Sequence, residues 1–161
     1  MINNSADIDL SSNRIADRKN NSEFLDRLLA QSKSDLGADV ITLYTFDQTS
    51  SQFQLFKIIG LNKPFNIVKQ KQSWKGLAWR VAQKRDIVTL TDIWTESSSL
   101  VRQSLFRKEG ITSYSGIPIT KNGLILGVLE CFFRQSFQPD PSWYSQLRNT
   151  VLQITSIIPI N

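Results

Sequence analysis

Few side chains in this sequence are suited to catalysis. Cys131 is the single cysteine and histidine is absent, which excludes Ser/His/Asp and Cys/His nucleophile systems, histidine-ligated haem and zinc-hydrolase sites. One cysteine also provides neither an internal disulfide nor a CxxC redox pair. Asp92 and Glu130 remain as a carboxylate pair for acid–base catalysis, but nothing in the sequence brings them together. We therefore expect a protein that binds rather than an enzyme.

Glu130 and Cys131 lie next to each other in an apolar stretch, residues 124–133. Burial in such a strand raises the pKa of a thiol, so we do not expect Cys131 to sense oxidants. We expect Glu130 to accept a hydrogen bond or form an ion pair at the margin of the sheet. The phosphate-binding patterns GxxxxGK[ST] and GxGxxG are absent, so no nucleotide-phosphate loop is indicated.

Positive charge is concentrated in one segment. Residues 57–85 contain eight basic side chains and no acidic one, in a chain of net charge +5. Such a segment could attract an anionic ligand, an acidic partner or a nucleic acid, or could simply be a solvated surface. Because no helix-turn-helix, zinc-finger or RNA-binding aromatic motif accompanies it, we expect no nucleic-acid partner.

The length and hydropathy indicate one cytoplasmic domain. A chain of 161 residues suits a single core. Its longest apolar runs stop well short of the roughly 20 residues that a membrane span needs, and the N-terminus lacks the pattern of a signal peptide. We expect no membrane insertion. Residues 1–21 are rich in Asn, Ser and Asp, and we expect them to form a flexible segment ahead of the domain.

The apolar patterning of the first two thirds alternates between helical and strand periods. Helical spacing over 22–36 ends at Gly37, a residue that tolerates the left-handed conformation. Further helices are expected from a possible cap at Ser73 to 85, and over 100–109. The expected strands are 39–46, 52–61 and 87–92, and the expected loops include 62–72 and 94–99.

The last third contains the clearest local signal. Asn122 and Gly123 are suited to a type I′ hairpin turn between strands over 113–120 and 124–134. The second strand is apolar in both of its alternating sets, so we expect both faces of the sheet to be covered. Asp140 and Pro141 then predict the start of a helix that Pro159 ends. The predicted fold is α+β: a central antiparallel sheet of five or six strands with helices on both faces.

Three stretches, taken in this order, resemble the GAF domain, a PAS-like sensor domain of signalling proteins. They are LGADVITLYTFDQTSSQFQL, GLAWRVAQKRDIVTLTDI and RKEGITSYSGIPITKNGLILGVLECFF. The tail FRQSFQPDPSWYSQL resembles the variety found upstream of HD-GYP phosphodiesterases, histidine kinases or diguanylate cyclases. The resemblance implies a GAF sensor domain over residues 22–161, acting in bacterial two-component or cyclic dinucleotide signalling.

The resemblance implies that a small molecule or partner binds between the sheet and the middle helices. The terminal helices would then relay binding and pair two copies as a homodimer. The alternative is a ligand-free dimerisation scaffold whose pocket its own side chains fill. From the resemblance we expect ligand-binding residues among the aromatic side chains of this region and the single cysteine. They are Tyr44, Trp74, Trp79, Trp94, Phe106, Tyr114 and Cys131.

Departures from the family's patterns exclude several of its activities. Covalent bilin attachment uses a pocket cysteine usually followed by histidine, whereas Cys131 lies within a predicted strand and histidine is absent. The Asn-Lys pair of cyclic-nucleotide relatives is replaced by Phe133 and Arg134. Free methionine sulfoxide reductases use several cysteines. HD-GYP and kinase outputs need histidine, so neither output lies in this chain, and no specific cofactor is implied.

Overall fold

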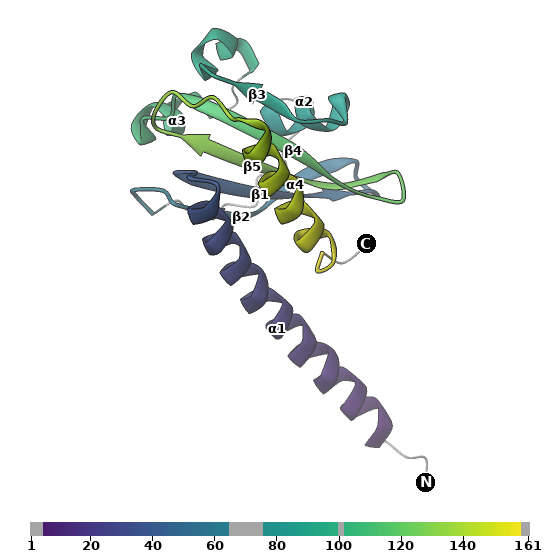
Figure 1. Cartoon of the computed structure of the whole chain (residues 1–161). Helices are drawn as coiled ribbons and strands as arrows, with labels where there is room; N and C mark the ends of the chain where they lie inside the picture. The colour runs from purple at the N-terminus through teal and green to yellow at the C-terminus, as the bar shows by residue number, and fades with distance from the viewer. Residues whose placement is uncertain (1–4, 65–75, 100–101, 159–161) are drawn as a thin grey trace.

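A five-stranded antiparallel sheet forms the centre of the protein, as a computed structural model that describes residues 5–64, 76–99 and 102–158 shows (Figure 1). The strand order is β2-β1-β5-β4-β3. In chain order the elements are α1 (Ser5–Asp35), β1 (Val40–Asp47), β2 (Gln52–Ile59), α2 (Leu77–Lys84), β3 (Val88–Leu90), η1 (Ile93–Ser99), α3 (Gln103–Glu109), β4 (Ser113–Lys121), β5 (Leu124–Phe133) and α4 (Pro141–Thr155). The predicted α+β fold with an antiparallel sheet is confirmed.

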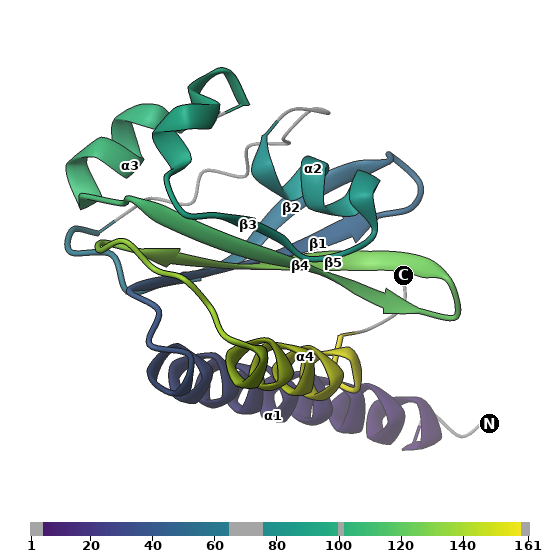
Figure 2. The ribbon, with the colours of Figure 1, turned by 45° about the horizontal axis from the view of Figure 1, so that its top comes forward.

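Helices cover both faces of the sheet, as the apolar patterning of β5 predicts. α1 and α4 lie side by side on one face, and α2, η1 and α3 lie on the other (Figure 2). Alternation along β5 sends Leu129 and Cys131 into the core shared with α1 and α4. The same alternation sends Val128 and Phe132 into the core on the α2 side. The sheet therefore separates two apolar cores, and β5 contributes side chains to both of them.

The β4–β5 hairpin has the predicted turn. Lys121 pairs with Leu124, and the two residues between them have positive φ, 51° at Asn122 and 77° at Gly123. Asn and Gly adopt this region at the lowest cost. The turn thereby fixes the register in which the two central strands pair.

α4 begins with the predicted cap. Asp140 Oδ1 accepts a hydrogen bond from the backbone N–H of Trp143 at 2.8 Å, and Pro141 is the first helical residue. The Trp143 indole N–H donates to the carbonyl of Leu36 at 2.8 Å, which ties α4 to the end of α1. The helix ends at Thr155, earlier than expected, and Pro159 lies outside the described residues.

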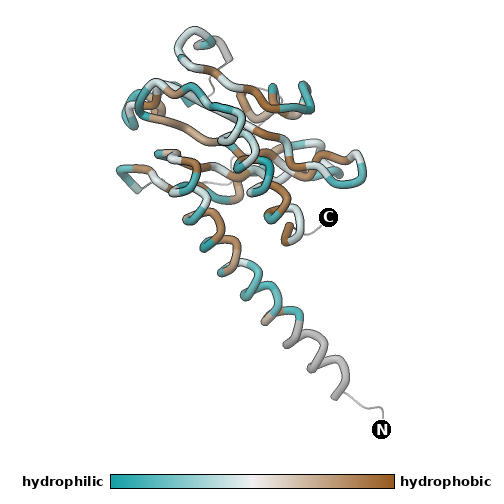
Figure 3. Tube along the Cα trace, viewed as in Figure 1, coloured by the Kyte–Doolittle hydropathy of each residue, from teal (hydrophilic) through white to brown (hydrophobic). Residues whose placement is uncertain are grey.

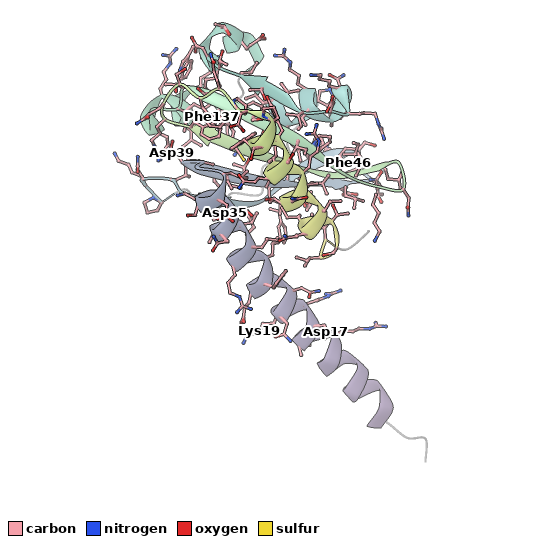
Figure 4. All side chains as sticks on the ribbon, viewed as in Figure 1. Asp17, Lys19, Asp35, Asp39, Phe46 and Phe137 are labelled. Atoms are coloured by element: carbon pink, nitrogen blue, oxygen red, sulfur yellow. The ribbon has the colours of Figure 1, made fainter. Side chains whose placement is uncertain are left out.

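α1 is longer than the sequence pattern predicts. The helix starts at Ser5 rather than at Ser22, so the expected flexible segment is helical over residues 5–21. No glycine or proline precedes Gly37, and extending a formed helix costs much less than nucleating one. The helix leaves the sheet, and beyond the sheet the stretch that Figure 3 colours by hydropathy is mainly hydrophilic. Asp17 and Lys19 project from this part (Figure 4).

The middle elements are shorter than expected. β3 has three residues, which pair with residues 114–116 of β4 at one edge of the sheet. α2 starts at Leu77 with Gly76 as its N-cap, while Ser73 lies outside the described residues. α3 starts at Gln103.

The expected loop at 94–99 is instead part of the 3-10 helix η1. Asp92 Oδ1 accepts a hydrogen bond from the backbone N–H of Trp94 at 2.9 Å, a side-chain turn that starts the helix. The Thr95 hydroxyl donates to the carbonyl of Asp92 at 2.8 Å and closes the same turn. Within the described residues, no helix combines the length and hydropathy needed to cross a membrane.

Candidate functional site

A small cavity lies between the α2 side of the sheet and α3. Its volume is about 30 Å3, enough for roughly two water molecules. β1 and β5 provide the floor and α3 provides one wall. Most of its lining is apolar and includes Val40, Ile58, Phe106 and Phe132. The polar lining residues are Thr42, Arg102, Glu109 and Glu130.

Glu130 is the charged residue of the cavity floor. It lies on the central strand β5, where its register partners are Thr42 on β1 and Gly116 on β4. The Thr42 hydroxyl donates to Glu130 Oε2 at 2.7 Å, and the Tyr114 hydroxyl donates to Glu130 Oε1 at 2.9 Å. The side chain is 3% exposed. A carboxylate thus stands in the middle of the sheet, held by one hydroxyl on each side.

Gly116 makes room for the Tyr114 phenol. A Cβ atom at Gly116 would lie 2.2 Å from Tyr114 Oη and 2.7 Å from Val81 Cγ2, closer than atoms can approach. The Tyr114 ring therefore lies along β4, over Gly116, a position that has no side chain. This arrangement lets its hydroxyl reach Glu130 from the neighbouring strand.

On balance the pKa of Glu130 is raised above its ordinary value, and the pKa of Tyr114 is raised as well. Burial raises the pKa of Glu130, while the hydroxyls of Thr42 and Tyr114 and the positive charge of Arg102 act in the opposite direction. Burial, and then the charge of Glu130, raise the pKa of Tyr114 well above its ordinary value. The phenol consequently stays protonated and remains a hydrogen-bond donor.

α3 forms the wall of the cavity opposite the sheet. Arg102, its N-cap residue, and Glu109, its last residue, line the cavity at opposite ends of the helix. Between them, the Phe106 ring packs on the Phe132 ring with centroids 5.0 Å apart. The half-buried Leu105 completes the apolar part of this wall. A ligand in the cavity would therefore touch α3.

The C-terminal end of α3 is held by a group that we call the Arg134 junction, consisting of Arg134, Glu109, Asp39 and Gly60. Arg134 Nη2 donates to Glu109 Oε2 at 2.6 Å and to the Gly60 carbonyl at 3.0 Å. Asp39 Oδ2 accepts from the backbone N–H of Arg134 at 2.7 Å. The junction connects the end of α3 to the end of β2 and to the residue that precedes β1.

Glu109 is ionised in this junction. Burial alone would raise its pKa, but the backbone N–H groups of Asn62 and Lys63 and the guanidinium of Arg134 bring the pKa below its ordinary value. The Asn62 N–H donates to Glu109 Oε2 at 2.9 Å. The charge of Glu109 is therefore balanced within the protein.

Of the predicted ligand-binding residues, Tyr44 and Phe106 line the cavity. Tyr114 lies in the same core and contributes indirectly, through its hydrogen bond to Glu130. Trp74 lies outside the described residues. The structure thus brings three of the predicted aromatic residues to one place.

Trp79 and Trp94 belong to the same core but do not line the cavity. The Trp79 ring packs against Phe53 with centroids 6.1 Å apart. The Trp94 indole N–H donates to the carbonyl of Ile111 at 3.0 Å, and the Arg107 guanidinium lies 4.2 Å from the centre of its ring. Both side chains fill or cover the core around the cavity.

Cys131 lies in the other core, on the α1 and α4 side of the sheet. Neighbouring strand residues point to opposite faces, so Cys131 cannot share a cavity with Glu130. Asp92 is exposed and does not line the cavity either. Among the described residues, no three His, Cys, Asp or Glu side chains form a cluster suited to a metal ion.

Glu130 itself was expected at the margin of the sheet, whereas it lies on the central strand. A sequence signal for its role exists: it is the single charged residue between Leu124 and Phe133. An acid in a strand that is apolar on both faces must be buried and paired. No comparable signal indicates Thr42 or Arg102, because their proximity to Glu130 depends on strand order and on the position of α3.

Comparison with known proteins places the chain in one family. The family model described as GAF domain matches residues 20–156. No curated protein sequence matches the chain. Among solved structures, the GAF domain of an Acinetobacter phosphoenolpyruvate-protein phosphotransferase is 19% identical with a TM-score of 0.68, covering 90% of this chain and 92% of that one.

Two further solved structures share the fold at low identity. The GAF domain of a two-component sensor histidine kinase from Bacillus halodurans is 14% identical with a TM-score of 0.68, covering 83% of this chain and 92% of that one. A type II free methionine-R-sulfoxide reductase from Thermoplasma acidophilum is 13% identical with a TM-score of 0.69, covering 88% and 94% respectively. The fold therefore occurs both in sensor proteins and in an enzyme.

Proposed function

This chain belongs to the GAF domain family, and we propose that it is a regulatory sensor domain of a bacterial signal-transduction protein. The cavity above Glu130 would bind a small molecule. The observation that carries this proposal is the carboxylate on the cavity floor, 3% exposed and held by two hydroxyls. A buried charge costs free energy of folding, and an apolar residue would fill the position at lower cost. Its presence beside a cavity supports a role in binding.

Binding would be relayed through the Arg134 junction. A ligand that shifts α3 moves Glu109, which is bonded to Arg134. Arg134 in turn is hydrogen-bonded to Asp39, four residues after the end of α1. The junction thus offers a continuous set of contacts from the cavity wall to α1, the helix that projects furthest from the sheet (Figure 1).

We further propose that two copies pair through α1 and α4. Exposed apolar side chains on these helices support pairing: Ile15 is 68% exposed, Phe24 49% and Leu152 69%. A groove of about 520 Å3 also runs between α1, the sheet and the residues that follow α4, and Phe56 and Leu126 are among its lining residues. If the cavity binds nothing, the same features favour the alternative function, a ligand-free dimerisation scaffold.

The output module would lie in a longer parent protein, and no catalytic step is proposed for this chain. The histidine kinase from Bacillus halodurans, whose GAF domain has this fold, supports a two-component system as one setting. A cyclic dinucleotide enzyme remains the other proposed output. Both settings imply a cytoplasmic domain.

Native mass spectrometry of freshly purified protein tests the proposal. We expect a small molecule to stay bound to the unsubstituted chain. It should be lost in Val40→Phe, because Val40 lines the cavity and a phenyl ring would fill it. Lys108→Gln, on the exposed face of α3, is the matched control and should retain the molecule. A dimer without any bound mass would contradict the sensor function and support the scaffold.

A further inference from the structure

We propose that the groove beside α1 receives α1 of a second copy running in the opposite direction, so that Ile15 of each copy enters the groove of the other. The groove has a volume of about 520 Å3 and lies between α1, the sheet and the residues that follow α4. This inference rests on the proposed function, since it assumes that two copies pair. It adds which surfaces meet and in which direction the two helices run.

The outer part of α1 has a face to offer to a partner. Among the described residues of this part, the side chains of residues 14–24 are exposed. Ile15 is 68% exposed. Helices in proteins draw most of their stability from the packing of one face rather than from propensity. A second helix lying alongside would supply the packing that this part of α1 does not obtain from its own chain.

Ile15 lies on the face of α1 that borders the groove. The groove-lining residues of this helix recur at intervals of three or four residues and therefore share one face. They are Arg18, Asn21, Ser22 and Leu25. Ile15 stands three residues before Arg18 and seven before Ser22, so it continues the same face toward the N-terminus. A helix packed along this face would contact both Ile15 and the groove.

An antiparallel pair that crosses at Asn20 aligns this isoleucine with the groove. A residue five positions before the crossing then lies opposite one five positions after it, so the partner's Ile15 meets Leu25. In the same way the partner's Arg18 meets Ser22. The arrangement has two-fold symmetry, so each copy contributes one isoleucine and one groove.

The groove has the room and the lining for this side chain. Its volume lies within the range of pockets that hold small ligands, which is ample for an isoleucine and the residues around it. Phe46 and Phe56 line it from the sheet, and Leu126 and Ile158 complete the apolar lining. Phe56 is 46% exposed. The pairing would therefore cover apolar surface on both partners.

The charges of α1 favour the antiparallel direction. Residues 14–19 contain three basic side chains and one acidic side chain, a net charge of +2. Residues 21–26 contain two acidic side chains and no basic one, a net charge of −2. Asp26 binds Lys57 of its own chain at 2.7 Å, which reduces this difference without reversing its sign. A crossing at Asn20 places opposite charges face to face, whereas a parallel pair would place like charges together.

Analytical ultracentrifugation of the full chain tests whether Ile15 takes part. Ile15→Ser should raise the dissociation constant of the dimer at least about tenfold, because each dimer buries this side chain twice. Ala16→Ser is the matched control, since it places the same residue at the next exposed position, off the face that borders the groove. The control should change the dissociation constant little. Urea unfolding confirms that both variants fold.

Disulfide cross-linking tests the direction. Chains with Arg18→Cys are mixed with chains with Ser22→Cys, one of them enlarged by a tag, and the mixture is mildly oxidised. We expect the mixed product, because these two positions face each other in the antiparallel pair. The unsubstituted chain, whose Cys131 is buried, is the control and should give no cross-link.

Ionic strength provides an independent measurement of the direction. The dissociation constant should rise as salt is added, because salt screens the attraction between the facing charges. Tighter pairing in salt would show that like charges face each other and would contradict the antiparallel pair.

The outcomes separate this inference from the proposed function. Cross-links only between identical positions would show a parallel pair and would overturn the inference, while the proposed pairing would stand. A dimer that Ile15→Ser leaves unchanged would likewise overturn the inference alone. A monomer at every protein concentration would overturn both the inference and the pairing.

Discussion

At the scale of single residues, the sheet assigns neighbouring side chains of β5 to different roles. Glu130 faces the cavity and Cys131 faces the α1 and α4 core, where it is 0% exposed. Burial, and then the charge of Glu130, raise the pKa of the Cys131 thiol far above its ordinary value. Because the thiolate is the reactive form, this cysteine is chemically protected in the folded state.

We expect Cys131 to react with a chromogenic disulfide reagent only when the protein unfolds. The reaction should be slow in buffer at neutral pH and fast in concentrated urea. Stopped-flow absorbance with a small free thiol as reference measures both rates. Rapid reaction of the folded protein would show that Cys131 is accessible and would restore the possibility of a redox role.

We also expect Glu130 to make stability depend on pH. Its pKa in the folded state is raised above the ordinary value of 4.5, so the folded state binds the proton more tightly. This favourable contribution is complete below pH 4.5 and is lost as pH rises through the folded-state pKa. Glu130→Gln does not titrate there, so its free energy of unfolding should increase relative to the parent as pH rises. Urea unfolding over a pH series measures this difference.

Glu23→Gln is the matched control for that experiment, because Glu23 is exposed on α1. Its stability relative to the parent should show no comparable trend. A Glu130→Gln variant that instead loses stability relative to the parent as pH rises would mean that the ionised carboxylate stabilises the fold.

At the scale of elements, two glycines of the β4–β5 hairpin are needed for different reasons. Gly123 has φ of 77° but open space for a Cβ atom, so Gly123→Ala should cost about 1–2 kcal/mol from backbone strain. A Cβ atom at Gly127 would lie 2.0 Å from the carbonyl oxygen of Tyr44 on β1. We expect Gly127→Ala to cost more, since two central strands must separate. Urea unfolding of both variants measures which one loses more free energy of unfolding. A larger loss in Gly123→Ala than in Gly127→Ala would contradict this expectation.

The Arg134 junction joins three elements, and we expect its loss to destabilise the fold. Arg134→Met leaves the Glu109 carboxylate, 4% exposed, without its cation, which should cost about 3 kcal/mol or more. Adding Glu109→Gln should recover part of the loss because the unpaired charge is removed. The pKa of Glu109 is lowered, so its contribution is present above the ordinary pKa and is lost as pH falls through the folded-state value.

A double-mutant cycle measured by urea unfolding at neutral pH gives the coupling between the two side chains. Glu109→Gln alone completes the cycle. Additive losses would show that the ion pair contributes nothing and would weaken the relay that we propose through it. Arg134 also donates to the Gly60 carbonyl, so the recovery should be incomplete.

At the scale of the whole molecule, the outer part of α1 is separate from the folded core. Side chains of residues 14–24 are exposed, whereas Leu25 and Leu29 are buried against the sheet. Removing residues 1–20 should therefore leave the free energy of unfolding of the monomer nearly unchanged. The same truncation should weaken the proposed dimer, because it removes Ile15 and half of the projecting helix.

Analytical ultracentrifugation and urea unfolding measure the two effects separately. A truncation through residue 34 serves as the comparison and should prevent folding, since it removes Leu25 and Leu29. A stable dimer of the shorter truncation would place the proposed interface elsewhere. A large loss of monomer stability would mean that the outer part of α1 contacts the core.

The sequence alone was enough for features set by neighbouring residues. Asn122 and Gly123 predicted the turn, Asp140 and Pro141 predicted the start of α4, and alternation along β5 predicted covered faces. These signals work because turn, cap and strand geometry depend on a few consecutive residues. The lack of a helix-breaking residue before Gly37 was equally visible, although the composition of residues 1–21 suggested flexibility.

The cavity, in contrast, was decided by tertiary structure. Glu130 accepts hydrogen bonds from Thr42, 88 residues away in the chain, and from Tyr114, 16 residues away. Strand order brings the three together, and the position of α3 adds Arg102 above them. The side-chain types indicate which hydrogen bonds are possible. Only the pairing of distant strands decides which of these residues meet. A buried charge is tolerated only where its partners are in place.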